Sequence, residues 1–366
     1  MRFLFYVPQM SEYGGMERHV CLLAMLLAQK GHQLVMLTTS NSLNQNTRDE
    51  LKSSGVELRE LQVARGHASK TRKVVWLLLN VLLLRHRSWD VIYSSGQSAL
   101  ARVAWLASDQ SSRIVHHHHT AADSDEQQTW HPLFRGLLAS APELVACSRT
   151  TKWNLKTVLR RDDIKYLPYL TPETDPYAVV RLTQVSPLGV VDFGFLGRLV
   201  SSKGIDTICR LSSQSELCNV RWHVHGRGEE YPPKYFDRFP NITFYGPYHG
   251  QGEIAAILAR LDAVVLFSTH NEGMPLSLIE AMSAGLPWIA TDRGGTAELA
   301  IIHQNCEVVP AYASFDDIVR CTLSLVSRIR AGMTSRAAQR RVYDENFAHA
   351  VCGRQWLEFL CQELPG

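Results

Sequence analysis

The chain has 366 residues, of which 45% are hydrophobic and 20% charged, and its formal net charge is +3. This length predicts two domains, each with its own core, and the composition is that of a globular protein. No basic stretch is interleaved with aromatic residues, which argues against a nucleic-acid partner. The eight cysteines lack metal-ligand or disulfide spacing, and the start is too short for a signal peptide, so we expect a cytoplasmic protein.

Short apolar runs alternate with helical patterns along the whole chain. This alternation is typical of parallel α/β architecture, and its two series predict two doubly wound parallel-sheet domains that face one another. In the first half, strands are expected near Phe3–Pro8, Gln33–Thr39, Val56–Leu61, Asp90–Ser95, Arg113–His119, Leu144–Ser148 and Lys165–Tyr169. In the second half, they are expected near Val190–Gly197, Val220–Gly226, Ile242–Gly246, Ala263–Ser268, Trp288–Thr291 and Glu307–Pro310.

The break between the domains is expected from Pro168 to Pro187, where Pro, Thr, Asp and Ser concentrate without strong periodicity. The two domains then cover residues 1–172 and 188–345, and residues 346–366 form a terminal segment. From Phe347 to Leu364 this segment has the pattern of one amphipathic helix, with Trp356 among its apolar contacts.

The first half is also the more basic one. Residues 1–170 hold 21 Lys and Arg against 14 Asp and Glu, a net of +7, whereas the rest holds 17 against 21, a net of −4. This asymmetry favours an acidic partner such as an anionic membrane surface, or else it serves solubility alone. Residues 74–84 are nearly all apolar between basic flanks, and eleven residues cannot span a bilayer. They predict a buried core helix or, alternatively, a helix lying on a membrane.

Two adjacent glycines follow the first predicted strand. Gly14 and Gly15 precede a helix that is expected from about Glu17, and such glycines let the backbone approach a ligand closely. They do not form a G-x-G-x-x-G fingerprint, which argues against a dinucleotide oxidoreductase.

Four consecutive histidines end a strand in the middle of the chain. Alternation puts His117 and His119 on one face of the strand and His116 and His118 on the other. Because ligands on opposite faces do not converge easily, zinc binding is the weaker alternative, and no metal site is predicted. His119 stands at the carboxyl end of the strand and is the best placed of the four to reach a cleft between the domains.

A loop in the second half carries an arginine and a lysine. Gly197 and Gly204 bracket this loop, and Arg198 and Lys203 lie within it. Arginine offers a planar fork for phosphate oxygens, and lysine offers a compact positive charge. Such a pair could neutralise a nucleotide diphosphate leaving group in place of Mg²⁺, with solvated loop charges as the alternative. Gly226 ends the next strand and suits a ligand that borders the sheet.

Two glutamates follow a buried strand at a characteristic spacing. The apolar run Ala263–Phe267 predicts that strand, and a helix is expected from Pro275 to about Gly285. Glu272 then stands in the strand-to-helix loop, with Glu280 about one and a half turns into the helix. Carboxylates accept hydrogen bonds from sugar or ribose hydroxyls, and amides at a helix start suit phosphate oxygens. The alternative is an acidic first turn favoured by the helix dipole.

Together these motifs resemble the retaining glycosyltransferase family 4, a group of nucleotide-sugar enzymes with the GT-B fold. The motifs are Gly14-Gly15, Gly197-Arg198 with Lys203-Gly204, Gly226-x-Gly228, and the E-x7-E stretch from Glu272 to Glu280. The resemblance implies two Rossmann-like domains facing a central cleft and a terminal helix that crosses back onto the first domain. The chain departs from the family at residues 167–171, where relatives often carry an Asn-Gly-Val-Asp-like turn.

The resemblance also implies a role for each site residue. Catalytic roles fall to Arg198, Lys203, Glu272 and His119, with His117 and His118 as alternatives to the last. Donor binding falls to Gly15, Gly197, Gly226, Gly273, Met274, Leu276 and Glu280. In this scheme the two cationic residues hold the donor diphosphate, Glu272 faces the donor sugar, and Glu280 accepts hydrogen bonds from the ribose.

The expected activity is therefore metal-independent, retaining transfer of a hexose from a nucleotide diphospho-sugar to a glycan or lipid-linked acceptor, without a cofactor. The roles usual in this family and the basic first half of the chain favour a function in cell-envelope or exopolysaccharide synthesis, at the inner face of the plasma membrane. One alternative is a glycoside hydrolase with Glu272 and Glu280 as its acid and nucleophile. Another is a nucleotide-sugar-binding protein that has lost activity. No motif specifies the nucleobase, the acceptor or the oligomeric state.

Overall fold

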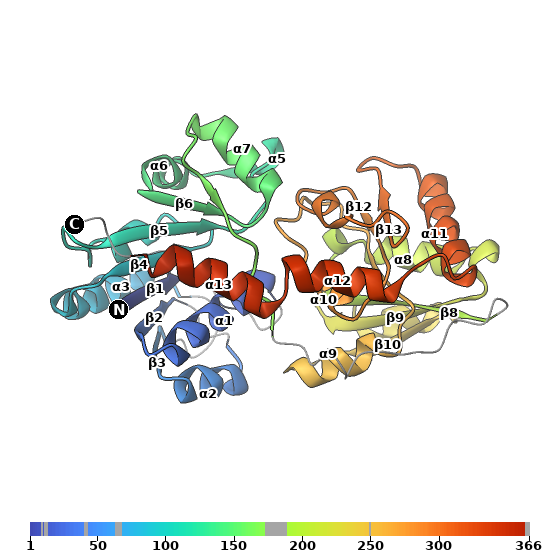
Figure 1. Cartoon of the computed structure of the whole chain (residues 1–366), viewed down its shortest axis with the longest axis horizontal. Helices are drawn as coiled ribbons and strands as arrows, with labels where there is room; N and C mark the ends of the chain where they lie inside the picture. The colour runs from blue at the N-terminus through green and yellow to red at the C-terminus, as the bar shows by residue number, and fades with distance from the viewer. Residues whose placement is uncertain are drawn as a thin grey trace. The chain divides into compact units, whose positions relative to one another are not determined.

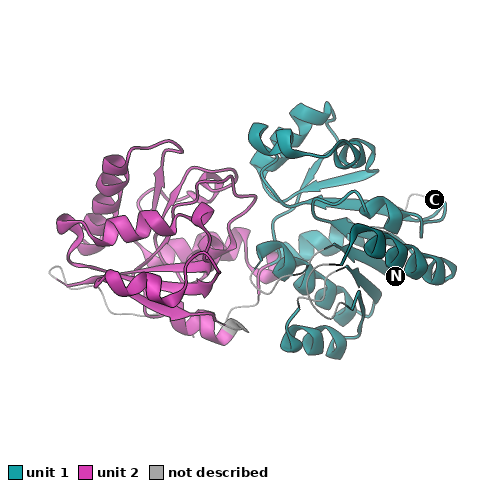
Figure 2. Cartoon of the chain, turned by 180° about the vertical axis from the view of Figure 1, so that it is seen from behind, with its two compact units in different colours: residues 1–170, 352–366 teal, residues 171–351 magenta. Residues whose placement is uncertain are grey.

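The structure is a computed structural model that describes residues 1–8, 10, 14–39, 43–62, 68–172, 189–248 and 250–362. The chain forms two compact units, coloured separately in Figure 2: unit 1 is Met1–Leu170 with Cys352–Gly366, and unit 2 is Thr171–Val351. Each unit has its own parallel sheet with helices around it (Figure 1), so the predicted pair of doubly wound α/β domains is confirmed. Most of the predicted interdomain segment, residues 173–187, lies outside the described residues.

The sheet of unit 1 has seven strands in the order β3-β2-β1-β4-β5-β6-β7, and every pair is parallel. The strands are β1 (Arg2–Val7), β2 (Gln33–Thr38), β3 (Val56–Glu60), β4 (Val91–Ser95), β5 (Arg113–His118), β6 (Glu143–Ala146) and β7 (Lys165–Tyr166). The predicted bounds are confirmed to within two residues except for β7, which ends three residues early. Its ladder stops after Leu167 donates to Ala146, because Pro168 has no N–H to continue it.

Helices cover both faces of this sheet. They are α1 (Gly15–Gln29), α2 (Gln45–Ser53), α3 (Lys70–Leu84), α4 (Ala101–Trp105), α5 (Ser124–Thr129), α6 (Pro132–Ser140) and α7 (Arg149–Leu159). Alternate residues of β1 enter two different cores: Phe3 and Phe5 pack with α1, whereas Leu4 and Tyr6 pack with α3, α4 and α6. A strand buried on both faces needs apolar residues at every position, which explains the continuous run in the sequence.

The apolar segment 74–84 forms most of α3, and only one of its faces is buried. Leu77, Val81 and Leu84 pack in the core, but Leu79 and Leu83 are 56% and 69% exposed. The prediction of a buried core helix is therefore correct for one face and wrong for the other. A helix lying across one sheet face contacts it along a single stripe, so an all-apolar sequence leaves apolar residues outside.

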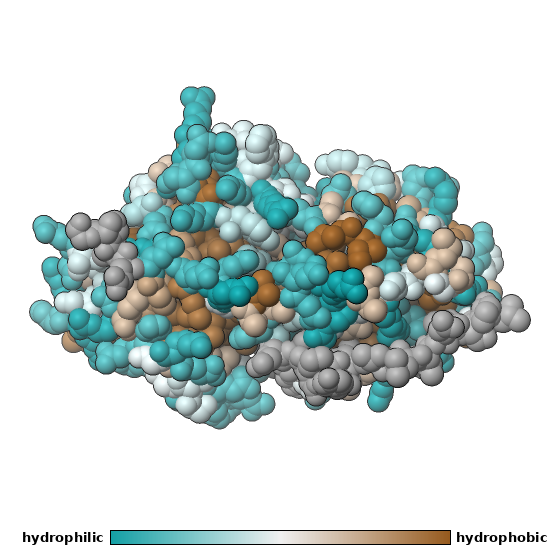
Figure 3. All heavy atoms as spheres, viewed as in Figure 1, coloured by the Kyte–Doolittle hydropathy of each residue, from teal (hydrophilic) through white to brown (hydrophobic). Residues whose placement is uncertain are grey.

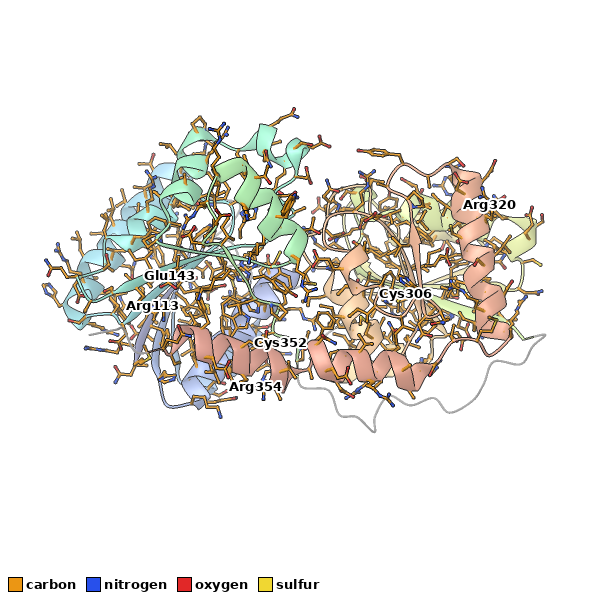
Figure 4. All side chains as sticks on the ribbon, turned by 45° about the horizontal axis from the view of Figure 1, so that its top comes forward. Arg113, Glu143, Cys306, Arg320, Cys352 and Arg354 are labelled. Atoms are coloured by element: carbon orange, nitrogen blue, oxygen red, sulfur yellow. The ribbon has the colours of Figure 1, made fainter. Side chains whose placement is uncertain are left out.

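The last helix, α13 (His349–Leu360), enters the core of unit 1. Trp356 is fully buried there, and its indole N–H donates to the Pro168 carbonyl at 2.8 Å. Arg113 donates to both carboxylate oxygens of Glu143 at 2.8 Å and also to the Leu360 carbonyl, and Figure 4 labels Arg113 and Glu143 beside each other. These contacts fix the chain after residue 351 to unit 1. The helix was predicted from Phe347 to Leu364, but it begins two residues later and ends at Leu360; residues 363–364 lie outside the described part of the chain.

The sheet of unit 2 has six parallel strands in the order β10-β9-β8-β11-β12-β13. The strands are β8 (Val191–Arg198), β9 (Val220–Arg227), β10 (Ile242–Gly246), β11 (Ala263–Leu266), β12 (Trp288–Thr291) and β13 (Cys306–Val309), each within two residues of its predicted bounds. The helices are α8 (Ile205–Ser212), α9 (Gly250–Leu258), α10 (Leu276–Ser283), α11 (Phe315–Arg330) and α12 (Arg336–Asn346). Because the strands are parallel, the loops after β8, β11 and β12 all begin at one edge of the sheet.

Candidate functional site

Two loops of unit 2 meet at the carboxyl ends of the neighbouring strands β8 and β11. The first passes through the short 3-10 helix η2 (Ser201–Lys203) to Gly204, and the second runs from Phe267 to Pro275. Gly204 has φ +78°, and a Cβ there would lie 2.1 Å from the Phe267 carbonyl oxygen, so only glycine lets the loops approach this closely. The Thr269 amide also donates to the Ser202 carbonyl at 2.9 Å.

This approach places Lys203 directly against Glu272. The ammonium nitrogen Nζ lies 2.7 and 2.8 Å from the two carboxylate oxygens, and the side chains are only 16% and 8% exposed. The Ser268 hydroxyl donates to the same carboxylate, and His270 Nε2 lies 3.6 Å from it. Burial alone would raise the pKa of Glu272, but Lys203, His270 and the Ser268 hydrogen bond outweigh it and lower the pKa. Glu272 is therefore an ionised hydrogen-bond acceptor.

The loop that carries Glu272 is fixed from a third side by the segment after β12. The Gly295 amide donates to the Glu272 carbonyl at 2.8 Å, and Glu272 and Gly294 form an isolated parallel bridge. The Thr291 hydroxyl donates to the Ser268 carbonyl at 2.6 Å. These hydrogen bonds hold the loop that carries the carboxylate in one position, which a site for a specific ligand requires.

Helix α10 begins four residues after Glu272. Its first residue is Leu276, one residue later than the predicted start at Pro275, which is instead the N-cap. Met274 and Leu276 are buried, at 5% and 7% exposed, and Glu280 is the fifth helical residue and is 5% exposed. The helix ends as predicted, because Gly285 follows the C-cap with φ +69°.

Arg198 is the last residue of β8 and is exposed. Among the described residues, its guanidinium has no ion-pair or hydrogen-bond partner. The glycines around it have a packing role: a Cβ at Gly226, where φ is +150°, would lie 1.8 Å from the Gly197 carbonyl oxygen. At Gly228 it would lie 2.0 Å from the Leu199 carbonyl oxygen. From the sequence, these glycines were expected to let the backbone approach a ligand. The structure gives another reason for glycine at these positions, because a side chain there would collide with the neighbouring backbone.

His119 lies in unit 1, in a group of buried rings. The predicted alternation is confirmed: His119 and His117 share one face, with ring centroids 3.9 Å apart, whereas His118 stacks on Phe134 on the other. The side chain is 8% exposed, and its Nδ1 lies 3.1 Å from the Tyr169 hydroxyl. Burial, with help from neighbouring imidazoles, holds the pKa of His119 well below its usual value, so the ring is neutral.

His19 belongs to the same group, although no sequence motif indicated it. Its ring stacks on Tyr169 with the centroids 5.1 Å apart, and it is fully buried. The Leu170 amide donates to its Nδ1 at 2.8 Å, which places the ring proton of the neutral form on Nε2. Burial lowers the pKa of His19 to about 3. The one available signal was its position, one helical turn after Gly15.

Glu126 organises the loop that follows β5, and sequence reasoning missed it. Its carboxylate accepts hydrogen bonds from the Thr120 hydroxyl at 2.6 Å, the Ala122 amide at 2.7 Å and the Trp130 indole at 3.0 Å. Burial would raise its pKa, but His118 and these hydrogen bonds lower the pKa to about 2. A D-x-x-E spacing at the start of α5, typical of a capping box, was the signal that could have revealed it.

The predicted site residues thus divide between the units. Gly15, which is the first residue of α1, and His119 belong to unit 1, and the remaining nine belong to unit 2. Within the described ranges, no three His, Cys, Asp or Glu side chains are arranged to hold a metal ion. In the same part of the chain, no helix combines the length and hydropathy that crossing a bilayer requires.

Two family models match the chain. Residues 13–169 match Glycosyltransferase Family 4, and residues 191–328 match Glycosyl transferases group 1. The second match contains every predicted site residue of unit 2, and the first contains both of those in unit 1.

Curated proteins and a solved structure are similar to the chain. A GDP-mannose-dependent alpha-mannosyltransferase of Mycobacterium tuberculosis is 28% identical over 50% of the chain, which spans only 43% of that protein. A human subunit of phosphatidylinositol N-acetylglucosaminyltransferase is 24% identical over 81% of the chain and 62% of its own length. The structure of Anabaena Alr3699/HepE in complex with UDP and glucose has a TM-score of 0.73 at 17% identity, covering 98% of the chain and 99% of that protein. This likeness establishes the fold.

Proposed function

Since the chain belongs to glycosyltransferase family 4, whose members have the GT-B fold, we propose that it moves a sugar from a nucleotide diphospho-sugar to a glycan or lipid-linked acceptor. The observation that carries this proposal is the pair of Lys203 and Glu272, 2.7 Å apart where the loops after β8 and β11 meet. A cation suited to phosphate oxygens and a carboxylate suited to sugar hydroxyls stand side by side there. Arg198, the last residue of β8 and five residues before Lys203, adds a guanidinium where the same loop begins.

The proposed reaction retains the anomeric configuration and uses no metal ion. Arg198 and Lys203 hold the diphosphate, and Lys203 exchanges Glu272 for a phosphate oxygen when the donor binds. The bond from the anomeric carbon to the phosphate oxygen breaks, and the acceptor oxygen bonds to that carbon on the same face. The acceptor proton passes to an oxygen of the departing diphosphate, whose negative charge the two cations stabilise. Glu280 would bind the ribose.

Glycoside hydrolysis is the second candidate, and the environment of Glu272 disfavours it. A general acid needs a raised pKa so that it is protonated before the bond breaks. The pKa of Glu272 is instead lowered by Lys203 and His270, and its carboxylate already accepts hydrogen bonds from Lys203 and Ser268. Release of sugar from a nitrophenyl glycoside in the absence of nucleotide would favour hydrolysis over transfer.

The names of the similar proteins support a class of nucleotide and a class of acceptor, and no single compound of either class. One relative is named for GDP-mannose and one solved structure holds UDP and glucose, so both uracil and guanine donors are candidates. Another relative is named for phosphatidylinositol, which supports a lipid-linked acceptor. A role in cell-envelope or exopolysaccharide synthesis at the inner membrane face fits such an acceptor and the basic first half of the chain. In this scheme His119 has a catalytic role and Gly15 binds the donor, and both residues belong to unit 1.

Thermal unfolding in the presence of donors tests the proposal. UDP-glucose, GDP-mannose and ADP-glucose, and the free nucleotides UDP, GDP and ADP, are each added at 1 mM to the full chain. A ligand present at a hundred times its Kd stabilises the folded state by about 2.7 kcal/mol. For a unit of this size, that corresponds to a rise in Tm of about 5–11 °C. We expect one donor and its nucleoside diphosphate to produce this rise, and the other two to produce less. No rise with any of them would contradict the proposal, and a rise without transfer to any acceptor would favour an inactive binding protein.

A further inference from the structure

The outer face of α3 presents a row of large apolar side chains to solvent. Val75, Leu79, Leu82 and Leu83 are 50%, 56%, 53% and 69% exposed. Their spacing of four, three and one residues puts them on a single stripe, opposite the buried stripe that packs on the sheet. A helix with one covered face ordinarily carries polar residues on the other, so this stripe needs a partner.

The neighbouring helices extend the same surface. Leu106, just after α4, and Leu133 on α6 are both 60% exposed. Helices α3 and α4 are in contact, and Arg102 of α4 donates to Ser140 of α6 at 2.9 Å, so the three helices lie together over one face of the sheet. Six of the thirteen large, exposed apolar residues in the described part of the chain are found here. Figure 3, viewed from the side on which α13 lies, shows a mainly hydrophilic surface with separate apolar patches.

The charges on these helices all have one sign. Helices α3, α4 and α6 and the short 3-10 helix η1 (Arg85–Arg87) contain seven Lys and Arg and no Asp or Glu. The seven are Lys70, Arg72, Lys73, Arg85, Arg87, Arg102 and Arg135. Only Arg87 forms an ion pair within the described residues, with Glu57. An apolar stripe with basic residues at both ends and no acid is the pattern of a helix that lies in an anionic membrane interface.

We propose that this face of unit 1, formed by α3, η1, α4 and α6, docks on an anionic phospholipid bilayer. The stripe of α3 enters the level of the headgroups, and the lysines and arginines around it contact the lipid phosphates. Helix α3 has 15 residues and is therefore roughly 22 Å long, which suits a helix in the plane of the interface. The proposal goes beyond sugar transfer, because it rests on a surface that shares no residue with the loops of Lys203 and Glu272.

Sedimentation with lipid vesicles tests the proposal on the full chain. The vesicles are phosphatidylcholine alone or phosphatidylcholine with 30 mol% phosphatidylglycerol, each in 0.1 M and 0.5 M NaCl. We expect partitioning to anionic vesicles that exceeds that to neutral ones by more than tenfold, because each basic residue near such a surface strengthens partitioning by about fivefold. The higher salt should remove most of this difference, since the Debye length is about 10 Å at 0.1 M and becomes shorter at 0.5 M, where surface charges are screened more strongly.

A matched pair of variants separates the stripe from general surface hydrophobicity. Leu79→Gln with Leu83→Gln should reduce partitioning at least tenfold, whereas Ile301→Gln with Met333→Gln, at exposed positions of unit 2, should leave it unchanged. All four positions are exposed, so the Tm of both variants should stay near that of the unmodified chain. Equal partitioning of the two variants would overturn the proposal. So would absence of vesicle binding, including the case in which the stripe instead mediates a concentration-dependent dimer that the Leu79/Leu83 variant abolishes.

Discussion

Replacing Lys203 with alanine is expected to reduce turnover by roughly 10²–10³-fold, the effect typical of losing one preorganised group that stabilises transition-state charge. It should also lower the stability of unit 2. Glu272 is 8% exposed, and removing one member of a buried ion pair costs about 3–5 kcal/mol because the remaining charge is left uncompensated. The measurements are steady-state transfer at saturating donor and thermal unfolding of the same preparation.

Two controls separate lost chemistry from lost stability in this experiment. Leu325→Ala removes a fully buried side chain of α11 and should destabilise unit 2 by about 2–5 kcal/mol without touching the site. Below its Tm, we expect this variant to turn over normally per folded molecule. Lys203→Arg keeps the charge and should retain part of the activity. If Lys203→Ala turned over as fast as Leu325→Ala below their unfolding transitions, Lys203 would have only a structural role.

Lowering the pH from 7 to 5 is expected to destabilise unit 1, at pH values above those at which carboxylates ordinarily titrate. Burial lowers the pKa of His19 to about 3, and burial with the neighbouring His118 lowers the pKa of His116 to about 3. In the unfolded chain both titrate near 6.5, so their contribution to stability is complete above that pH and is lost as the pH falls. At pH 5, each of these histidines lowers the free energy of unfolding by about 2 kcal/mol, since one pKa unit corresponds to about 1.36 kcal/mol.

The pH effect is measured by urea unfolding at pH 8, 7, 6 and 5, followed by tryptophan fluorescence. His19→Asn serves as the matched variant, because its amide oxygen can still accept the hydrogen bond that Leu170 donates to Nδ1, but it does not titrate. This variant should be less stable at pH 8, owing to lost packing, and should show a shallower fall between pH 6.5 and 5. Stability that stays constant from pH 7 to pH 5 would contradict the buried, neutral state of these rings.

The strands and their parallel arrangement could be predicted because burial on both faces leaves a strong local signal. Val264, Val265 and Leu266 form an apolar run that a strand at the centre of a sheet requires, and the helices between such runs fix the strand direction. The same reasoning located Glu272 and Lys203 in loops at the carboxyl edge of one sheet. The sequence could not predict that these two side chains form an ion pair. They are 69 residues apart, and their contact depends on how two loops pack against each other.

The missed features share that dependence on tertiary contacts. His19 lies in an ordinary helical pattern, and only the fold brings it against Tyr169. Glu126 has a capping-box spacing, but its contacts with Trp130 and Thr120 follow from the path of the loop after β5. For α3 the sequence left two predictions open, a buried core helix and a helix lying on a membrane, and the structure shows one buried and one exposed face. A fully apolar helix predicts burial all round, and the sequence alone does not say how many neighbours are available to cover it.

A crystal structure with a nucleoside diphosphate bound tests the central claim most directly, because it locates the phosphates. The account predicts phosphate oxygens within hydrogen-bond distance of Arg198 and of Lys203, whose Nζ has then left the Glu272 carboxylate, and the ribose hydroxyls against Glu280. A nucleotide bound elsewhere, with the 2.7 Å contact between Lys203 and Glu272 unchanged, would contradict it.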